Sequence, residues 1–463
     1  MKLAIFTDSF RPNLDGVATV THLLAKEMVK KGHKVTIVCP GDNSESGIQY
    51  GFKVIRLKSY SIKLTDLMKI CFKSPGYVEK LEDFSKYDLV HLQSPATIGA
   101  LGYLIALKHN LPLSCTFHTN VGDFAQSFVK KEVLAHESSN PFYNGLIKND
   151  FLIKGFAKSI NYLAWNLIKN FHLAVPNTTV PARFCKKLLR DKGVKNEIFV
   201  INNPVSPTKS KKDYSKKYNL KNKMPIIHVG RISAEKRIDV FIRVIANLKK
   251  SIPNILGIIC SDGLIKSDLM NMAKKLKAEN NILFTGFVKR DELSWLYENS
   301  RIVTAFGLYE TFNLCAAEGL FYGKPLVLSD SGPHPELING NGFLIEPNNN
   351  EVKGFSEKIS LLLNDDSLRN NMGKKSRAHW KNYEYKSLIN KHEKYFIESM
   401  NKNLISNKNY VNFIKYLAVL GISMNTLLLS LSLKEKKDMG LIEEFEKFSS
   451  SMNEEVKKLK KSF

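Results

Sequence analysis

Two glutamates stand at a spacing that could serve chemistry in the stretch LYETFNLCAAEGL. Glu310 and Glu318 are eight positions apart, and most residues between them are small or apolar. Both carboxylates can accept hydrogen bonds from the hydroxyl groups of a ligand. The alternative is a pair of carboxylates on a solvated helix, which the apolar neighbours disfavour.

The run between the glutamates favours a helix, and an expected strand at 302–306 precedes it. We expect the helix to begin near Thr311 or Phe312, with Thr311 as its N-cap. Free N–H groups at a helix N-terminus beside a parallel sheet can bind an anion such as a diphosphate. Glu310 would then lie in the loop before the helix and Glu318 two turns inside it.

Two further stretches have features of an anion site. In HVGRISAEKRID, Gly230 allows a close approach, and Arg231 and Lys236 could clamp a diphosphate. In FTDSFRPNLDGVATV, a loop leads to Gly16 at a helix start. The chain has no G-x-G-x-x-G, so a dinucleotide enzyme is disfavoured.

The stretch CTFHTNVGDF places His118 at the end of an expected strand, with Asp123 following. The position of His118 at the end of a strand favours a functional role for its side chain. The alternative is a structural histidine whose ring nitrogens are hydrogen-bonded within the protein. The sequence has no HExxH motif and no paired Cys/His spacing, so we expect no protein-held metal.

Length and composition indicate a globular protein of two or three domains. The chain has 463 residues, 43% of them hydrophobic and 24% charged, with a net charge of +25. Such a charge suits anionic lipid, nucleic acid or phosphorylated small molecules as partners. The sequence has no nucleic-acid-binding motif, so nucleic acid is the disfavoured partner. Six cysteines without CxxC spacing indicate buried thiols in a reducing cytosol.

Short apolar runs alternate with amphipathic helical patterns over most of the chain, which predicts two α/β domains with doubly wound parallel sheets. We expect a first domain at 1–205, a linker at 206–224, a second domain at 225–385, a closing helix at 386–400 and a helical tail at 401–463. The expected strands are 3–6, 34–39, 88–93, 113–118, 173–177, 198–202, 226–230, 254–260, 281–286, 302–306 and 325–330. The cleft between the lobes is the expected active site.

Two apolar segments interrupt this pattern. Residues 144–172 are helical in pattern, aromatic and basic, and could pack in the core or touch a membrane. Residues 416–433 contain no charged side chain, and they could enter a membrane or its interface, or dock on the body of the protein.

The motifs resemble those of the retaining nucleotide-sugar glycosyltransferases of glycosyltransferase family 4, which have the GT-B fold. The resemblance covers about residues 1–399 and rests on YETFNLCAAEGLFYGKPLV, GRISAEKR, FTDSFRPNLDGVATV and GPHPELI. It implies two Rossmann-like domains facing across a cleft, with a helical C-terminal extension. It also implies a UDP-sugar donor as substrate and no bound cofactor or metal.

The resemblance implies a role for each matching residue. Glu310 would bind hydroxyls of the donor sugar and Glu318 its ribose. Arg231 and Lys236 would hold the diphosphate and neutralise the leaving nucleotide. The remaining contacts would come from the backbone amides of Asn313 and Leu314, from Gly16 on the phosphate and from His118 on the transferred sugar.

The chain departs from the family pattern at two places. The family often has Gly-Phe-Gly after the first glutamate, where this chain has Thr311, Phe312 and Asn313. Ser261 stands where a glycine is usual.

The stretch TFHTNVGDFAQSFVKK is similar to a His-Thr-x-x-x-Asp-Tyr stretch of the diacylglycerol glucosyltransferases, which are monotopic enzymes. This likeness implies a membrane lipid acceptor, with Asp123 on the acceptor side, and the basic charge suits an anionic membrane surface.

The expected function is transfer of a hexose, with glucose as the expected sugar, from a UDP-sugar to a lipid such as diacylglycerol. The enzyme would be cytoplasmic, peripheral or monotopic at the inner face of the cell membrane. Alternatives are a mannosyl or galactosyl transferase acting on a polysaccharide or lipid-linked glycan, another GT-B enzyme such as an epimerase, and a non-enzymatic basic membrane-binding protein.

Overall fold

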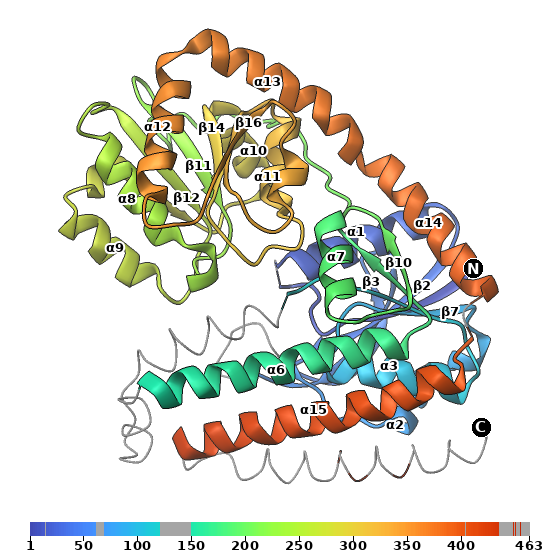
Figure 1. The fold of residues 1–463 in the computed structure, drawn as a ribbon. Coiled ribbons are helices and arrows are strands. Elements are labelled where there is room, and N and C mark those ends of the chain that lie inside the picture. The colour runs from blue at the N-terminus through green and yellow to red at the C-terminus, as the bar shows by residue number, and fades with distance from the viewer. Residues whose placement is uncertain are drawn as a thin grey trace. The chain divides into compact units, whose positions relative to one another are not determined.

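The chain forms two compact units, which Figure 1 draws in a computed structural model. The structure describes residues 1–13, 15–61, 69–120, 150–402 and 404–434, and residues 448, 450 and 454. Unit 1 comprises Met1–Pro204 and Lys386–Phe463, and unit 2 comprises Val205–Tyr385. The chain therefore completes unit 2 before its last part returns to unit 1.

Unit 1 contains an eight-stranded sheet in the order β10-β9-β8-β7-β1-β2-β4-β3. Its neighbouring strands pair in parallel, except that β3 runs antiparallel to β4. The strands are β1 (Lys2–Phe6), β2 (Lys34–Gly41), β3 (Glu45–Gln49), β4 (Phe52–Lys58), β7 (Leu89–Leu92), β8 (Leu113–Thr116), β9 (Asn177–Val180) and β10 (Glu197–Val200). A separate ribbon pairs β5 (Tyr60–Ser61) with β6 (Lys69–Ile70). The strand order reverses between β1 and β7, where an open α/β sheet binds its ligands.

The helices of unit 1 are α1 (Gly16–Lys30), α2 (Pro75–Glu79), α3 (Thr97–Lys108), α6 (Asp150–Ala174), α7 (Arg183–Asp191), α14 (Tyr385–Lys402) and α15 (Asn407–Lys434). Asp15 caps α1 by accepting a hydrogen bond from the Ala18 amide at 2.9 Å. Helix α3 is buried from Thr97 to Leu107, because it packs within the main core of the unit.

The last two helices are anchored within unit 1. On α14, the Tyr395 hydroxyl donates to Asn177 Oδ1 at 2.7 Å. On α15, the ring of Phe413 stacks on Tyr103 at 3.6 Å between centroids, and the Tyr416 hydroxyl donates to the Ala96 carbonyl at 3.1 Å. The start of α15 is therefore docked on the body of unit 1. Within the part of the chain that the structure describes, no helix combines the length and the apolar character needed to cross a membrane.

Unit 2 contains a six-stranded parallel sheet in the order β13-β12-β11-β14-β15-β16. The strands are β11 (Met224–Val229), β12 (Ile255–Cys260), β13 (Ile282–Gly286), β14 (Ile302–Ala305), β15 (Leu326–Ser329) and β16 (Gly342–Ile345). The helices are α8 (Ile238–Leu248), α9 (Lys266–Lys275), α10 (Arg290–Asn299), α11 (Leu314–Phe321), α12 (Glu351–Asn364) and α13 (Asp366–Trp380). The order reverses between β11 and β14. Both sheets thus confirm the doubly wound α/β class.

Residues 206–224, where we expected a linker, lie within unit 2. Tyr218 is 5% exposed and stacks on Trp295 of α10, with 6.1 Å between ring centroids. Aromatic residues in a Lys-rich segment thus bind it to the domain that follows.

The strand expected at 173–177 was wrong, because Leu173 and Ala174 complete α6 and the strand is β9, which begins at Asn177. Most residues of β9 are polar, so the sequence contains no continuous apolar run that would predict a strand there.

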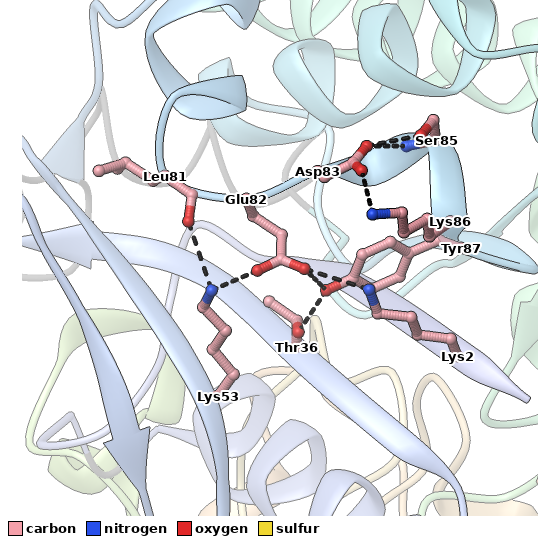
Figure 2. Close-up of polar contacts among 9 residues, drawn as sticks. All are labelled: Lys2, Thr36, Lys53, Leu81, Glu82, Asp83, Ser85, Lys86 and Tyr87. Carbon is pink, nitrogen blue, oxygen red and sulfur yellow. Dashed lines mark hydrogen bonds and ion pairs between the residues drawn. The ribbon is translucent and has the colours of Figure 1, made fainter.

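A polar network joins the amino ends of β1 and β4 in unit 1, and Figure 2 shows it. The carboxylate of Glu82 pairs with Lys2 Nζ at 3.2 Å and with Lys53 Nζ, and it accepts a bond from the Tyr87 hydroxyl at 2.9 Å. Tyr87 in turn shares a 2.6 Å hydrogen bond with Thr36. Because ligands of such sheets bind at the carboxyl edge, we assign this network at the amino edge to structure.

Candidate functional site

The predicted residues of unit 2 gather where the strand order reverses. Gly230 and Arg231 follow β11, and Glu310 follows β14, so both loops leave the carboxyl edge of neighbouring strands. This edge beside a topological switch point is the usual ligand site of an open parallel sheet.

Lys236 and Glu310 form the central ion pair of this edge. Lys236 Nζ donates to Glu310 Oε1 at 2.6 Å, and both side chains are largely buried. Burial alone would lower the pKa of Lys236, but the charge of Glu310, its hydrogen bond with Lys236 and the charge of Glu235 together outweigh burial, so this pKa is raised. Burial raises the pKa of Glu310, but the charge of Lys236, the nearby His334 and the hydrogen bond from Lys236 together outweigh burial, so this pKa is lowered. Both groups are therefore ionised at neutral pH.

A glycine makes room for this carboxylate. A methyl group on Gly307 would lie 2.9 Å from Glu310 Oε1. A side chain at position 307 would therefore push Glu310 away from Lys236.

Helix α11 begins at Leu314 with Asn313 as its N-cap, so the expectation of Thr311 was wrong. Asn313 has φ 67° and its Oδ1 accepts from the Ala316 amide at 3.0 Å. Its Nδ2 donates to His334 Nε2 at 2.9 Å, and His334 Nδ1 donates to the Ser329 carbonyl at 2.8 Å. The buried ring of His334 thus fixes the cap, since each of its nitrogens has a defined partner.

Glu318 lies in α11 and is paired with a residue that we did not predict. Arg290 Nη1, at the start of α10, donates to Glu318 Oε1 at 2.6 Å. Burial raises the pKa of Glu318, and the charge of Arg290 offsets this only in part. Arg290 lies in the stretch KRDELSW, which matches no motif, so the sequence gave no reason to select it.

Arg231 and Ser261 complete the surroundings. Arg231 Nη2 lies 3.3 Å from Glu235 Oε1, with 38% of its side chain exposed. Ser261 has φ 144°, in the region that favours glycine, and this explains why glycine suits the position.

In unit 1, Gly16 follows β1, at the reversal, and His118 follows β8, the strand beyond β7. Gly16 is the first residue of α1, after β1. His118 follows β8 and its Nε2 bonds to Gln93 Oε1. Burial lowers the pKa of His118 to about 3, so the ring is neutral. Asp123 lies outside the described residues.

Sequence comparisons match both halves of the chain. Residues 14–209 match the model "Glycosyltransferase Family 4", and residues 210–379 match "Glycosyl transferases group 1". The alpha-monoglucosyldiacylglycerol synthase of Streptococcus pneumoniae is 25% identical over 355 residues, covering 74% of each chain. A GDP-mannose-dependent alpha-mannosyltransferase of Corynebacterium glutamicum is 24% identical over 357 residues, covering 75% of this chain and 77% of that protein.

Solved structures share the fold. The Anabaena protein HepE, solved with UDP and glucose, superposes with a TM-score of 0.63 at 17% identity, covering 86% of this chain and 100% of that chain. Sucrose-phosphate synthase from Thermosynechococcus elongatus gives a TM-score of 0.63 at 15% identity, covering 86% of this chain and 98% of that chain. With two Rossmann-like units and both family models matched in order, the chain belongs to the family 4 glycosyltransferases of the GT-B fold.

Proposed function

We propose that this glycosyltransferase moves a hexose, expected to be glucose, from a UDP-sugar to a membrane lipid such as diacylglycerol, with retention at the anomeric carbon. The observation that carries the donor half of the proposal is the buried Lys236–Glu310 pair beside the N-terminus of α11. The name of the pneumococcal relative supports the sugar and the acceptor, and the UDP-glucose complex of HepE supports the donor.

The residues of unit 2 supply charge and hydrogen bonds in this proposal. Arg231 and Lys236 neutralise the diphosphate as the bond between the anomeric carbon and the phosphate oxygen breaks. The first amides of α11, at Asn313 and Leu314, add partial positive charge at the same place.

Glu310 accepts hydrogen bonds from the sugar hydroxyls and Glu318 from the ribose. The acceptor hydroxyl then attacks on the face that the phosphate leaves, and its proton passes to the departing phosphate. In unit 1, Gly16 is proposed to contact the phosphate, His118 the transferred sugar and Asp123 the acceptor.

A lipid acceptor places the enzyme on the cytoplasmic face of the cell membrane, as a peripheral or monotopic protein. The net charge of +25 supports an anionic membrane surface as partner, because each basic residue near such a surface contributes about 1 kcal/mol. The name of a second relative, from Acholeplasma laidlawii, is again alpha-monoglucosyldiacylglycerol synthase.

A second candidate is mannosyl transfer from GDP-mannose, because the corynebacterial relative is named for that donor. One experiment separates the two candidates. Purified protein is incubated with UDP- and GDP-sugars and a lipid extract, and products are identified by mass. We expect a hexosyl lipid from UDP-glucose; a product formed only from GDP-mannose, or only on a soluble sugar, would contradict the proposal.

The variant Glu310→Gln tests the role of the site in the same assay. We expect transfer to fall by at least about a hundredfold, because the amide carries no charge to pair with Lys236 or to accept strongly from hydroxyls. Binding to vesicles should be unchanged. A basic membrane-binding protein without activity would instead show no turnover in either form, and an epimerase would consume UDP-sugar without acceptor.

A further inference from the structure

His228 carries a buried nitrogen without a partner beside the proposed donor site. The residue lies near the end of β11 and is 2% exposed. Its ring packs against Phe241 and Phe306, with centroids about 6 Å away. Among the residues that the structure describes, Nε2 has no hydrogen-bond partner. A buried polar atom left unpaired is costly, so such an atom calls for a physical reason.

The protonation of this ring follows from its other nitrogen. Nδ1 lies 3.2 Å from the Thr304 carbonyl, which can only accept, so Nδ1 carries the hydrogen. Burial, with a smaller contribution from Lys236, lowers the pKa of His228 to about 4. At neutral pH the ring is therefore uncharged, and Nε2 offers a lone pair to a hydrogen-bond donor.

The space beside Nε2 is shared with Lys236. A methyl group in place of a Gly230 hydrogen would lie 3.7 Å from His228 Nε2 and 4.0 Å from Lys236 Cδ. Nζ is two bonds beyond Cδ, so the end of the lysine side chain and His228 Nε2 border the same space at Gly230. The Lys236 ammonium has three N–H donors, and within the described part of the chain its hydrogen bond goes to Glu310.

We propose that His228 is a positioning residue, whose Nε2 accepts a hydrogen bond from Lys236 Nζ when the donor nucleotide is bound. The proposal rests on the proposed function, in which Glu310 turns to sugar hydroxyls and the ammonium of Lys236 turns to the diphosphate.

In the structure the ammonium of Lys236 and the carboxylate of Glu310 pair with each other at 2.6 Å. Binding of the donor divides this pair, and His228 then holds the ammonium over Gly230, next to the phosphate. The lone pair of His228 Nε2 thus has a hydrogen-bond donor when the nucleotide is bound.

The test compares His228→Phe with His228→Gln. Phenylalanine suits a pocket lined by two phenylalanines but has no acceptor, whereas the glutamine side chain can place its oxygen near the position of Nε2. Binding of UDP and of GDP to the full chain is measured by calorimetry, and thermal unfolding is measured for each variant. We expect His228→Phe to bind the preferred nucleotide about tenfold more weakly, and His228→Gln to recover most of the loss.

A double-mutant cycle with Lys236→Met isolates the contact. We expect His228→Phe to weaken binding no further once Lys236 is removed, because the acceptor then has no donor to hold. Equal binding by wild type and His228→Phe, a His228→Gln variant as weak as His228→Phe, or additive effects in the cycle would each overturn the inference. If Lys236→Met does not fold, the comparison of Phe with Gln decides it. Binding of neither nucleotide by the wild-type protein would overturn the proposed donor as well as the inference.

Discussion

Asn313 holds a backbone conformation that glycine adopts more easily than other residues. At φ 67° and ψ 75°, a side chain usually costs about 1 kcal/mol or more, and asparagine is among the residues that tolerate it best. Here its amide caps α11 and bonds to His334. The position therefore needs a left-handed residue, which explains why relatives of the motif often have glycine. Asparagine meets the same need and adds a cap.

Asp8 gives a prediction about pH. Asp8 follows β1, is 8% exposed, and accepts bonds from the Ser94 hydroxyl at 2.5 Å and the Ile98 amide at 3.0 Å. Burial raises its pKa from 3.8 to about 6, although these hydrogen bonds act in the opposite direction. Between these two values the folded chain binds more protons at Asp8 than the unfolded chain, so its contribution to the unfolding free energy falls as pH rises.

We therefore expect Asp8→Asn to gain stability relative to wild type on going from about pH 5 to about pH 7.5. The expected relative gain is about 1 kcal/mol, because asparagine does not ionise. Thermal unfolding of both proteins at the two pH values measures it. The matched control is Asp83→Asn, whose carboxylate is exposed and has a lowered pKa of about 2, so it is ionised at both pH values. A difference between wild type and Asp8→Asn that does not change with pH would contradict the assignment.

At the scale of elements, the sequence predicted the buried parallel strands best. Strands such as Ile255–Cys260 are continuous apolar runs, because helices cover both faces of the sheet. The antiparallel strand Glu45–Gln49 is exposed at the sheet edge and carries no such run, so it was not expected. Strand β16, Gly342–Ile345, was also missed.

The site was predictable where a motif fixes residue identity and not where the partner is distant in sequence. Glu310 and Lys236 are 74 positions apart, and the motifs that contain them gave both residues but not their ion pair. Arg290 belongs to no motif, and only the fold brings it to Glu318. His228 opens the stretch HVGRISAEKRID, but the sequence gave no role for its ring beside Lys236.

Helix α15 supplies a prediction about packing. Phe413 is fully buried against Tyr103, whereas Val411, two residues earlier, is 52% exposed. We expect Phe413→Ala to destabilise unit 1 by about 3–5 kcal/mol, because it removes a large buried ring. The control Val411→Ala should change stability by less than about 0.5 kcal/mol. Urea unfolding of the full chain, together with proteolysis of α15, measures both. Equal effects of the two variants would show that α15 is not docked in solution.

At the scale of the whole molecule, the sheets of the two units share one topological feature. In each sheet the order reverses beside the first strand of the unit, at β1/β7 and at β11/β14. Gly16, Arg231 and Glu310 follow strands at these reversals. His118 follows β8, one strand away from the reversal. The chain ends in unit 1, where α14 and α15 add helices beyond the 14–379 segment that the family models match. Unit 1 therefore depends on residues from both ends of the chain.

The net charge of +25 yields a prediction about the membrane. If an anionic bilayer is the partner, binding should depend on lipid charge and on salt, because exposed charges more than about 10 Å apart are screened at 0.1 M salt. We expect the protein to sediment with phosphatidylglycerol-containing vesicles at low salt. It should bind neutral phosphatidylcholine vesicles much less, and it should be released from the anionic vesicles as salt rises toward about 0.5 M.

The Glu310→Gln variant serves as the control, since it alters the site and hardly alters the charge. Binding that persists equally on neutral vesicles at high salt would instead point to apolar insertion. If the protein binds neither kind of vesicle, its net charge no longer supports a lipid acceptor, because the protein surface would then have no measurable attraction for a membrane.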